Sequence, residues 1–298
     1  MSTIPERRAR IGAARALLFA PANEARKVRR LPDFGADAVV LDLEDAVADS
    51  EAEAARAGVA SALATPAYRD AAAVRCVRIN SWSSGLGPVD LRGLPVALLD
   101  AVVVPKVETA AELVEIDRAL AGAEREAGLE PGAVGLICLV ETARGITGLP
   151  GICADLPARV ARLVFGSGDF TAELGVTWRP MSPATVTARD LVVLHSRAAG
   201  LPPPFDGPYL DIHDADGLRR DCEDSLAHGL TGRVCVYPAQ VAVAQGVYAD
   251  DADLDHARRL VDAFEKALGE GSASIQFDGV FVDYPIYEQA RRKVARAS

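Results

Sequence analysis

The sequence predicts a (β/α)8 barrel of the TIM type with a small C-terminal appendage. Two observations favour this fold class. Short apolar runs rich in Val, Ile and Leu recur along the chain, and a helix-like stretch follows each of them. Strands buried on both faces, as in a parallel sheet, have this continuous apolar character. An open doubly wound sheet is the alternative, but no GxGxxG motif follows the first apolar run.

The expected strands are short, and together with their helices they extend over about 230 residues, which is the usual length of a barrel. They lie at 16–21, 38–45, 74–80, 101–106, 134–141, 162–169, 208–212 and 232–238. Two of the helices between them begin with the spacing of a capping box, Ser50 with Glu53 and Thr109 with Glu112. Three helices can end at a glycine, namely at Gly128, Gly200 and Gly229.

The chain changes character at about residue 247. A charged amphipathic helix is expected over 251–271, and a last helix over 286–297. Between them, Asp278 and Gly279 separate two alternating apolar segments, which is the signature of a two-residue β-hairpin. We therefore expect residues 1–246 to form the catalytic barrel and residues 247–298 an appendage that packs on a neighbouring subunit.

Composition excludes several classes of protein. The formal net charge of −10 argues against a general nucleic-acid binder, which needs a basic face. No apolar run approaches the roughly 18 residues of a membrane span, and the charged N-terminus has no signal-peptide pattern. The five cysteines are odd in number and have no CxxC spacing, which is typical of reduced, mostly buried cysteines. We expect a cytoplasmic protein that acts on a small molecule.

Charged side chains stand at the ends of most expected strands. The carboxyl ends of barrel strands meet at one mouth, where the chemistry of barrel enzymes takes place. The residues at these ends are Glu44, Asp45, Arg78, Asn80, Lys106, Glu141, Asp169 and Asp211. A single carboxylate at a strand end is more often a helix cap or part of a surface ion pair. The joint pattern favours a site.

Electrostatics indicates what such a site would hold. Two carboxylates about 4 Å apart repel one another by roughly 4 kcal/mol at an effective dielectric constant of 20. A converging acidic cluster must therefore take up protons, pair with Arg or Lys, or bind a cation. Oxygen ligands without His or Cys favour Mg²⁺, and Glu141 and Asp169 are the best placed ligands. Glu44 and Asp45 can then orient Arg78 or Lys106, while Asp42 is interpreted as structural.

Seven motifs occur in an order and spacing that resemble the citrate lyase β-subunit family of the HpcH/HpaI aldolase superfamily, which includes malyl-CoA and citramalyl-CoA lyases. They span almost the whole chain and read RALLFAPAN, AVVLDLEDAV, VRIN, VVPKVE, LVETARGI, VFGSGDFTAELG and FVDYPIYEQA. The resemblance implies a barrel of the phosphoenolpyruvate type, assembled as a trimer or a hexamer. It also implies Mg²⁺-dependent cleavage or formation of a C–C bond in a 3-hydroxyacyl thioester, which gives an acyl-CoA and a 2-oxoacid.

The resemblance also implies roles for individual residues. Glu141 and Asp169 match the family's metal ligands, and Arg78 matches the arginine that contacts substrate oxygens. Glu44 and Asp45 match the acidic pair beside that arginine. Asp283 matches an aspartate that reaches a neighbouring subunit's site as an acid or base.

Binding of the substrate is expected to involve Arg78 and Lys106. The basic run at 26–30, which includes Arg26 and Lys27, can bind CoA phosphates or can simply be a solvated helix face.

Two departures from the family pattern leave the thioester carrier open. Tyr237 and Arg233 replace residues that lie near the acyl carrier in relatives. Three possibilities therefore remain: a stand-alone CoA lyase, a subunit that needs a partner's carrier, and a free-acid aldolase or thioesterase. His213 lies near an expected strand end, but as a lone histidine it is interpreted as a packing or supporting residue.

Overall fold

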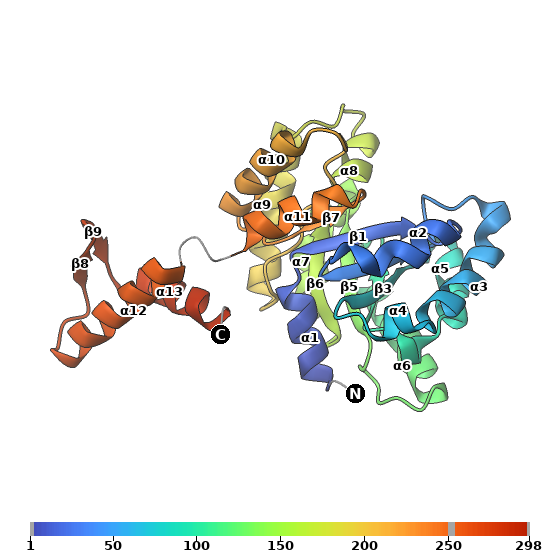
Figure 1. Cartoon of the computed structure of the whole chain (residues 1–298), viewed down its shortest axis with the longest axis horizontal. Coiled ribbons are helices and arrows are strands. Elements are labelled where there is room, and N and C mark those ends of the chain that lie inside the picture. Colours follow the sequence, from blue (N-terminus) through green and yellow to red (C-terminus); the bar gives the residue numbers. More distant parts are fainter. Residues whose placement is uncertain (1–2, 250–253, 297–298) are drawn as a thin grey trace. The chain divides into compact units, whose positions relative to one another are not determined.

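The computed structural model describes residues 3–249 and 254–296 (Figure 1). Contacts divide the chain into two compact units, Met1–Gly246 and Val247–Ser298. Each unit has its own hydrophobic core.

Within the described residues, the first unit contains seven parallel strands in the order β6-β5-β4-β3-β2-β1-β7. Their bounds are β1 Ala16–Pro21, β2 Ala38–Asp42, β3 Val74–Arg78, β4 Ala101–Val104, β5 Gly135–Val140, β6 Val160–Phe165 and β7 Arg233–Cys235. The pairing register aligns the carboxyl ends, since Asp42 of β2 pairs with Arg78 of β3 and Val140 of β5 pairs with Phe165 of β6. Residues that follow these strands therefore start from one end of the sheet. The curled parallel sheet fits a TIM-barrel-like fold.

The prediction of a strand at 208–212 is wrong. Phe205 and Asp206 form isolated parallel bridges instead, Phe205 with β6 and Asp206 with β7. The Phe205 N–H donates to the Leu163 carbonyl at 2.9 Å, and the Asp206 N–H donates to the Gly232 carbonyl at 2.8 Å. Pro208 has no N–H to donate to a ladder, which explains why the pairing stops before the apolar run. Asp211 is consequently not a strand-end residue, and it is exposed.

Helices follow the strands, as the apolar pattern predicts (Figure 1). They are α1 Ile4–Ala13, α2 Ala25–Arg30, α3 Ala52–Leu63, α4 Pro66–Arg69, α5 Leu86–Gly93, α6 Ala110–Glu126, α7 Ala143–Ala154, α8 Ser167–Glu173, α9 Pro183–Ala198, α10 Ala215–Ala227 and α11 Ala239–Tyr248. Gly128, Gly200 and Gly229 follow α6, α9 and α10 with positive φ, as predicted.

Of the two predicted capping boxes, one is half formed and one is absent. The Thr109 hydroxyl accepts from the Glu112 N–H at 3.2 Å, but the Glu112 carboxylate accepts from the Glu108 N–H instead of closing the box. The prediction of a capping box at Ser50 is wrong. A 3₁₀ turn over Asp49–Glu51 precedes α3 there, and α3 has no side-chain cap.

The second unit contains α12 Leu254–Gly269, the antiparallel pair β8 Ile275–Phe277 and β9 Val280–Val282, and α13 Tyr284–Arg296. Asp278 and Gly279 connect the two strands, both with positive φ. This is the backbone that an Asp-Gly hairpin requires. Phe264 is fully buried at the centre of this unit, where its ring stacks on Tyr287.

In the part of the chain that the structure describes, no helix has the length and apolar character needed to cross a membrane.

Candidate active site

Arg78 is held at the carboxyl end of β3 by two acidic residues from the β2 end. Its Nε and Nη2 each donate to Asp42, both at 2.7 Å. Nη1 lies 2.8 Å from Glu44 Oε2, a close ion pair that lacks hydrogen-bonding geometry. The guanidinium also lies 5.4 Å from the ring centroid of Phe19 on β1. Arg78 is therefore fixed in direction, with its side chain 11% exposed.

Asp42 is a site-forming residue that the sequence interpretation missed. It is buried, and the parallel register places it directly opposite Arg78. The available signal was its place as the last residue of β2, next to a strand that ends in arginine. Asn80 adds to the same corner, because its Nδ2 donates to the Leu43 carbonyl at 2.9 Å and so fixes the segment that carries Glu44.

Lys106 joins the acids that follow β2 and β6. Its ammonium lies 2.7 Å from Glu44 Oε1, 3.3 Å from Asp45 Oδ1 and 3.2 Å from Asp169 Oδ1. Burial lowers the pKa of Lys106, but the hydrogen bond that Lys106 donates to Glu44 and the charges of the three carboxylates outweigh burial and raise it. Lys106 is thus a permanent cation within an acidic cluster.

The backbone of Lys106 is also unusual. Its φ of 51° lies in the left-handed region, which is uncommon for a residue with a side chain. In this conformation the Lys106 N–H donates to Glu141 Oε1 at 2.9 Å. Such backbone strain is found preferentially at functional sites, and here one residue holds Glu141 through its backbone and Asp169 through its side chain.

Glu141 follows β5 and is only 2% exposed. Burial raises the pKa of Glu141 from its ordinary 4.5 to about 8, and the charges of Asp169 and Glu44 act in the same direction. Its carboxylate lies against Gly166, where a Cβ would overlap both Oε2 and Cβ of Glu141. Gly166 is therefore required for the position of this acid.

The pKa of Glu44 is also raised, although its surroundings differ from those of Glu141. Burial raises the pKa of Glu44 to about 7, although Arg78 and Lys106 oppose this effect. Two carboxyl groups that change charge near neutral pH are typical of a functional site and not of a surface ion pair.

The acids fit a hard divalent cation. Glu141 and Asp169 place carboxylate oxygens after neighbouring strands, and Glu141 is an acid whose burial is costly without a cation. Among residues 3–249 and 254–296, no group of three or more His, Cys, Asp or Glu is placed to hold a metal ion. Mg²⁺ usually takes one or two protein carboxylates and completes its shell with water and substrate, so a pair such as Glu141 and Asp169 is of the kind that it binds.

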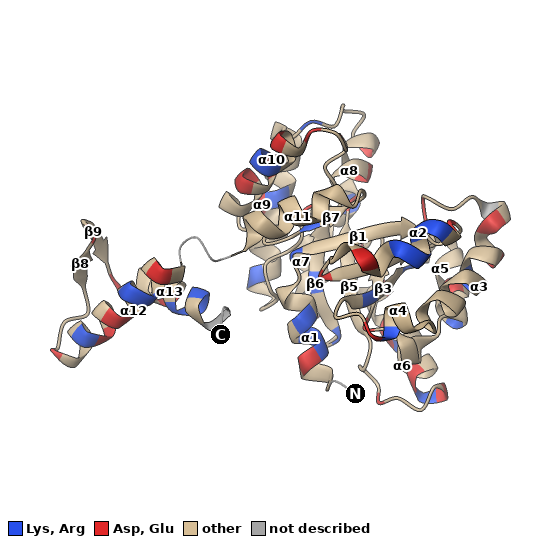
Figure 2. Cartoon of the chain, viewed as in Figure 1, with Lys and Arg blue, Asp and Glu red and all other residues tan. Residues whose placement is uncertain are grey.

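Other residues singled out from the sequence are not part of the Arg78–Lys106 cluster described above. Arg26 and Lys27 are exposed on α2, which is largely basic in Figure 2, and Lys27 pairs with Glu24 at 2.6 Å. Asp283 belongs to the second unit, directly before α13. Tyr237 is exposed after β7.

Arg233, one of the two departures from the family pattern, is buried within the first unit. Arg233 is 1% exposed and pairs with Asp206 and Asp221 inside the first unit, together with Arg189. The sequence alone does not distinguish a strand residue whose side chain points into the protein from one whose side chain points to the mouth of the barrel. His213 is exposed on the segment before α10, and its backbone N–H donates to Asp211 Oδ1.

A sequence model of the family described as HpcH/HpaI aldolase/citrate lyase matches residues 15–238. The chain belongs to the HpcH/HpaI aldolase/citrate lyase family. This confirms the resemblance inferred from the strand-end motifs.

Several relatives in this family match along nearly the whole chain. The citrate lyase subunit beta of Escherichia coli K12 is 32% identical over 95% of this chain and 93% of the relative. A mitochondrial citramalyl-CoA lyase of Mus musculus is 32% identical, over 95% and 86%. A (3S)-malyl-CoA thioesterase of Cereibacter sphaeroides is 34% identical, over 95% and 94%.

A solved structure extends the comparison to ligands. The CitE protein of Mycobacterium tuberculosis, in complex with magnesium, acetoacetate and coenzyme A, superposes with a TM-score of 0.75 at 29% identity. The match covers 96% of this chain and 99% of CitE. The Mg²⁺ expected from the sequence is thus the ion bound in a structure of a relative.

Proposed function

We propose that the chain is a Mg²⁺-dependent carbon–carbon lyase that acts on a 3-hydroxyacyl-CoA thioester such as malyl-CoA or citramalyl-CoA. The products would be an acyl-CoA and a 2-oxoacid, and the reverse condensation is equally compatible with the site. The observation that carries the proposal is the convergence of Glu141, Asp169 and Arg78 from three strand ends on Lys106 and Glu44. Relatives named as lyases of such thioesters support it.

Glu141 and Asp169 would hold the ion. When bound, Mg²⁺ supplies Lewis-acid polarisation of the oxygens of the 2-oxoacid portion. Lys106 keeps Glu141 in place through its N–H and balances part of the negative charge. Gly166 leaves the room that the Glu141 carboxylate needs.

Arg78 would stabilise negative charge on the enolate oxygen that remains when the C–C bond breaks. Two of its five N–H groups are used on Asp42, which sets the plane of the guanidinium and leaves donors for the substrate. A preorganised donor of this kind is worth about 3 kcal/mol or more of barrier lowering.

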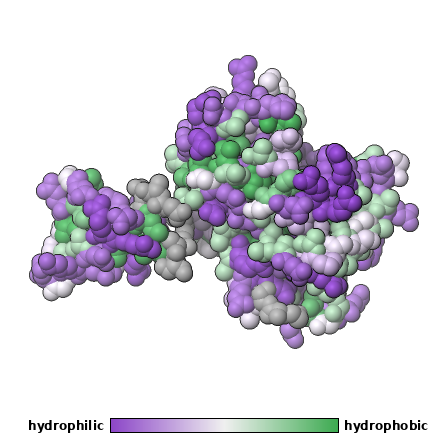
Figure 3. Space-filling view, viewed as in Figure 1, coloured by the Kyte–Doolittle hydropathy of each residue, from purple (hydrophilic) through white to green (hydrophobic). Residues whose placement is uncertain are grey.

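Asp283 of a neighbouring copy would add or remove the proton at carbon, which implies a homo-oligomer such as a trimer. The hairpin and helix that flank Asp283 support contact with another surface, because Val280, Phe281 and Tyr284 are at least half exposed. Figure 3 displays hydrophobic patches on this unit. Arg26 and Lys27 on α2 are the proposed contacts for CoA phosphates.

The activity can be tested with the purified full-length chain. Mg²⁺ with malyl-CoA or citramalyl-CoA should give glyoxylate or pyruvate, detected as the phenylhydrazone. Glu141→Gln should abolish product while the protein stays folded by circular dichroism. If wild-type protein that binds Mg²⁺ releases no 2-oxoacid from malyl-CoA and none from citramalyl-CoA, lyase activity on these substrates is refuted.

Two relatives favour alternative reactions of the same site. The (3S)-malyl-CoA thioesterase suggests thioester hydrolysis, which would release CoA thiol and free hydroxyacid without a 2-oxoacid. The citrate lyase subunit beta suggests a substrate presented on a partner's carrier. Measuring thiol and 2-oxoacid in the same reaction separates hydrolysis from C–C cleavage. A carrier-bound thioester that is active where free CoA thioesters are not would select the carrier-dependent subunit.

A further inference from the structure

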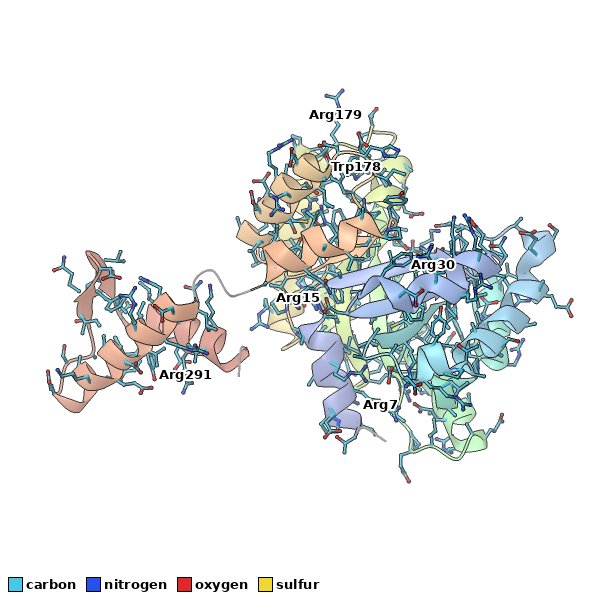
Figure 4. The ribbon with its side chains drawn as sticks, viewed as in Figure 1. Arg7, Arg15, Arg30, Trp178, Arg179 and Arg291 are labelled. Atoms are coloured by element: carbon cyan, nitrogen blue, oxygen red, sulfur yellow. The ribbon has the colours of Figure 1, made fainter. Side chains whose placement is uncertain are left out.

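A second charged site lies at the opposite end of the strands. A cavity of about 560 Å³ is lined by Arg8 of α1, Arg118 and Arg125 of α6, and Gly132 and Arg159. Gly132 lies three residues before β5 and Arg159 directly before β6, so the cavity lies at the amino ends of these strands, whereas Glu141 and Asp169 follow their carboxyl ends. In Figure 4, Arg7 of α1 lies at the far end of the first unit from Trp178, which follows α8.

The floor of this cavity is a rigid network in which one arginine faces two carboxylates, a net charge of −1. Arg159 donates to Asp117 at 2.5 Å and to both oxygens of Glu124, at 2.9 and 3.0 Å. The same Glu124 carboxylate accepts from the N–H groups of Gly132 and Val134, at 2.8 and 2.7 Å. The acids near the cavity are therefore used by Arg159 and by the backbone.

The remaining three arginines give the cavity its positive charge, because with Arg159 they outnumber the acids Asp117 and Glu124 by two. Arg8, Arg118 and Arg125 form no ion pair and no side-chain hydrogen bond with any residue that the structure describes. Nε of Arg8 is shielded from solvent and has no hydrogen-bond partner, which is a costly state for a charged donor. Three unpaired guanidinium groups around one cavity are unexpected in a chain with a net charge of −10.

A small residue lies between two of these arginines. Arg118, Ala121 and Arg125 follow one another at helical spacing on a single face of α6, and Ala121 lines the cavity. Gly132 also lines the cavity, and its φ of 90° accounts for the glycine at this position. The planar forks of several arginines are the usual protein partners of phosphate groups.

We infer that this cavity binds a small-molecule polyanion with two or more phosphate groups, either a nucleoside polyphosphate or an inorganic polyphosphate. Four arginines against two carboxylates leave a net charge of +2, which attracts a di- or triphosphate, and the volume suits a ligand of that size. The site is separate from the acidic mouth and does not depend on the reaction proposed there.

Isothermal titration with inorganic tripolyphosphate and with ATP, in low-salt buffer containing EDTA, tests the site. The wild-type chain should bind tripolyphosphate saturably, and Arg118→Gln/Arg125→Gln should weaken binding by about tenfold or more. Both arginines are exposed helix residues, so the fold should be kept. Tighter binding of ATP than of tripolyphosphate would identify a nucleotide ligand, and equal affinities would identify an inorganic one.

Two control variants make the result decisive. Arg219→Gln/Arg220→Gln removes the same charge from exposed positions of α10 and should leave affinity unchanged within about twofold. Arg26→Gln/Lys27→Gln reports binding at α2 instead. The inference is overturned if the wild-type chain shows no saturable binding. It is overturned equally if either control weakens binding as much as Arg118→Gln/Arg125→Gln does.

Discussion

Arg78 and Asp42 stand opposite one another at the last positions of two neighbouring parallel strands, joined by two hydrogen bonds of 2.7 Å. The sheet register creates this pair, since a shift of one residue would turn one of the side chains to the other face. Asp42 is therefore a positioning residue for Arg78, although the sequence alone suggested only a structural role.

Replacement of Asp42 by Asn should lower kcat by about tenfold to a hundredfold, the usual effect of losing a partner that orients an active-site group. The amide can accept only one of the two hydrogen bonds, so Arg78 loses its fixed plane. KM should change less than kcat.

Asp100→Asn is a matched control for that experiment. Asp100 is equally buried and accepts two hydrogen bonds from Arg75, but it precedes β4 at the amino end of the sheet. It should lower the melting temperature without the kcat effect. Equal kcat losses in both variants would show that Asp42 acts only through general stability.

Gly166→Ala should disrupt metal binding, because the added methyl group would overlap the Glu141 carboxylate. The φ of Gly166 is −88°, which alanine adopts without strain, so the effect is steric and not conformational. Gly168→Ala, two residues further in α8, meets nothing within 4 Å and is the control. Titration with Mn²⁺ should give weaker binding for Gly166→Ala only. Wild-type affinity in both variants would contradict the assigned position of Glu141.

Lys106→Met should tighten divalent-ion binding by about tenfold, because an ammonium 3.2 Å from Asp169 opposes the approach of another cation. Activity should nevertheless fall, since the anionic substrate loses an attractive charge. Lys27→Met, which removes an exposed lysine of α2, should leave the ion affinity unchanged. Weaker ion binding in Lys106→Met would mean that Lys106 supports the ligands more than it competes with the ion.

The metal-free protein should lose stability as the pH rises through neutrality. The pKa values of Glu44 and Glu141 are raised from 4.5 to about 7 and about 8, mainly by burial. The folded protein therefore holds protons that the unfolded chain releases. The resulting stability is complete below about pH 4.5 and is lost as the pH rises to about 8.

Melting temperatures in EDTA across this range measure the effect. Glu141→Gln should have a flatter pH profile than the wild type, and Mg²⁺ should stabilise the wild type more at pH 8 than at pH 6, since protons and the ion compete for Glu141. Identical profiles for the two proteins would contradict the raised pKa of Glu141.

The sequence predicted the sheet well because burial on both faces leaves a strong apolar signal. All six strands expected before residue 170 are present, with bounds that differ by a few residues. The strand expected at 208–212 failed because Pro208 interrupts pairing, and of the apolar side chains after it Tyr209 is buried while Leu210 and Ile212 are exposed.

The site was predictable as a set of strand-end residues but not as a network. Parallel strands bring Glu44, Arg78, Lys106, Glu141 and Asp169 to one end by topology alone. Which acid binds which cation depends on register and backbone conformation. The left-handed Lys106, which joins Glu141 to Asp169, leaves no trace in composition or periodicity.

Direct measurement of ion binding tests the central claim. Titration of the metal-free chain with Mn²⁺, followed by calorimetry or electron paramagnetic resonance, should reveal one ion per chain. Glu141→Gln and Asp169→Asn should each weaken binding by about tenfold or more. Asp211→Asn, which alters an exposed acid, should not. Unchanged affinity in both ligand variants would contradict the assignment of Glu141 and Asp169 as the metal site.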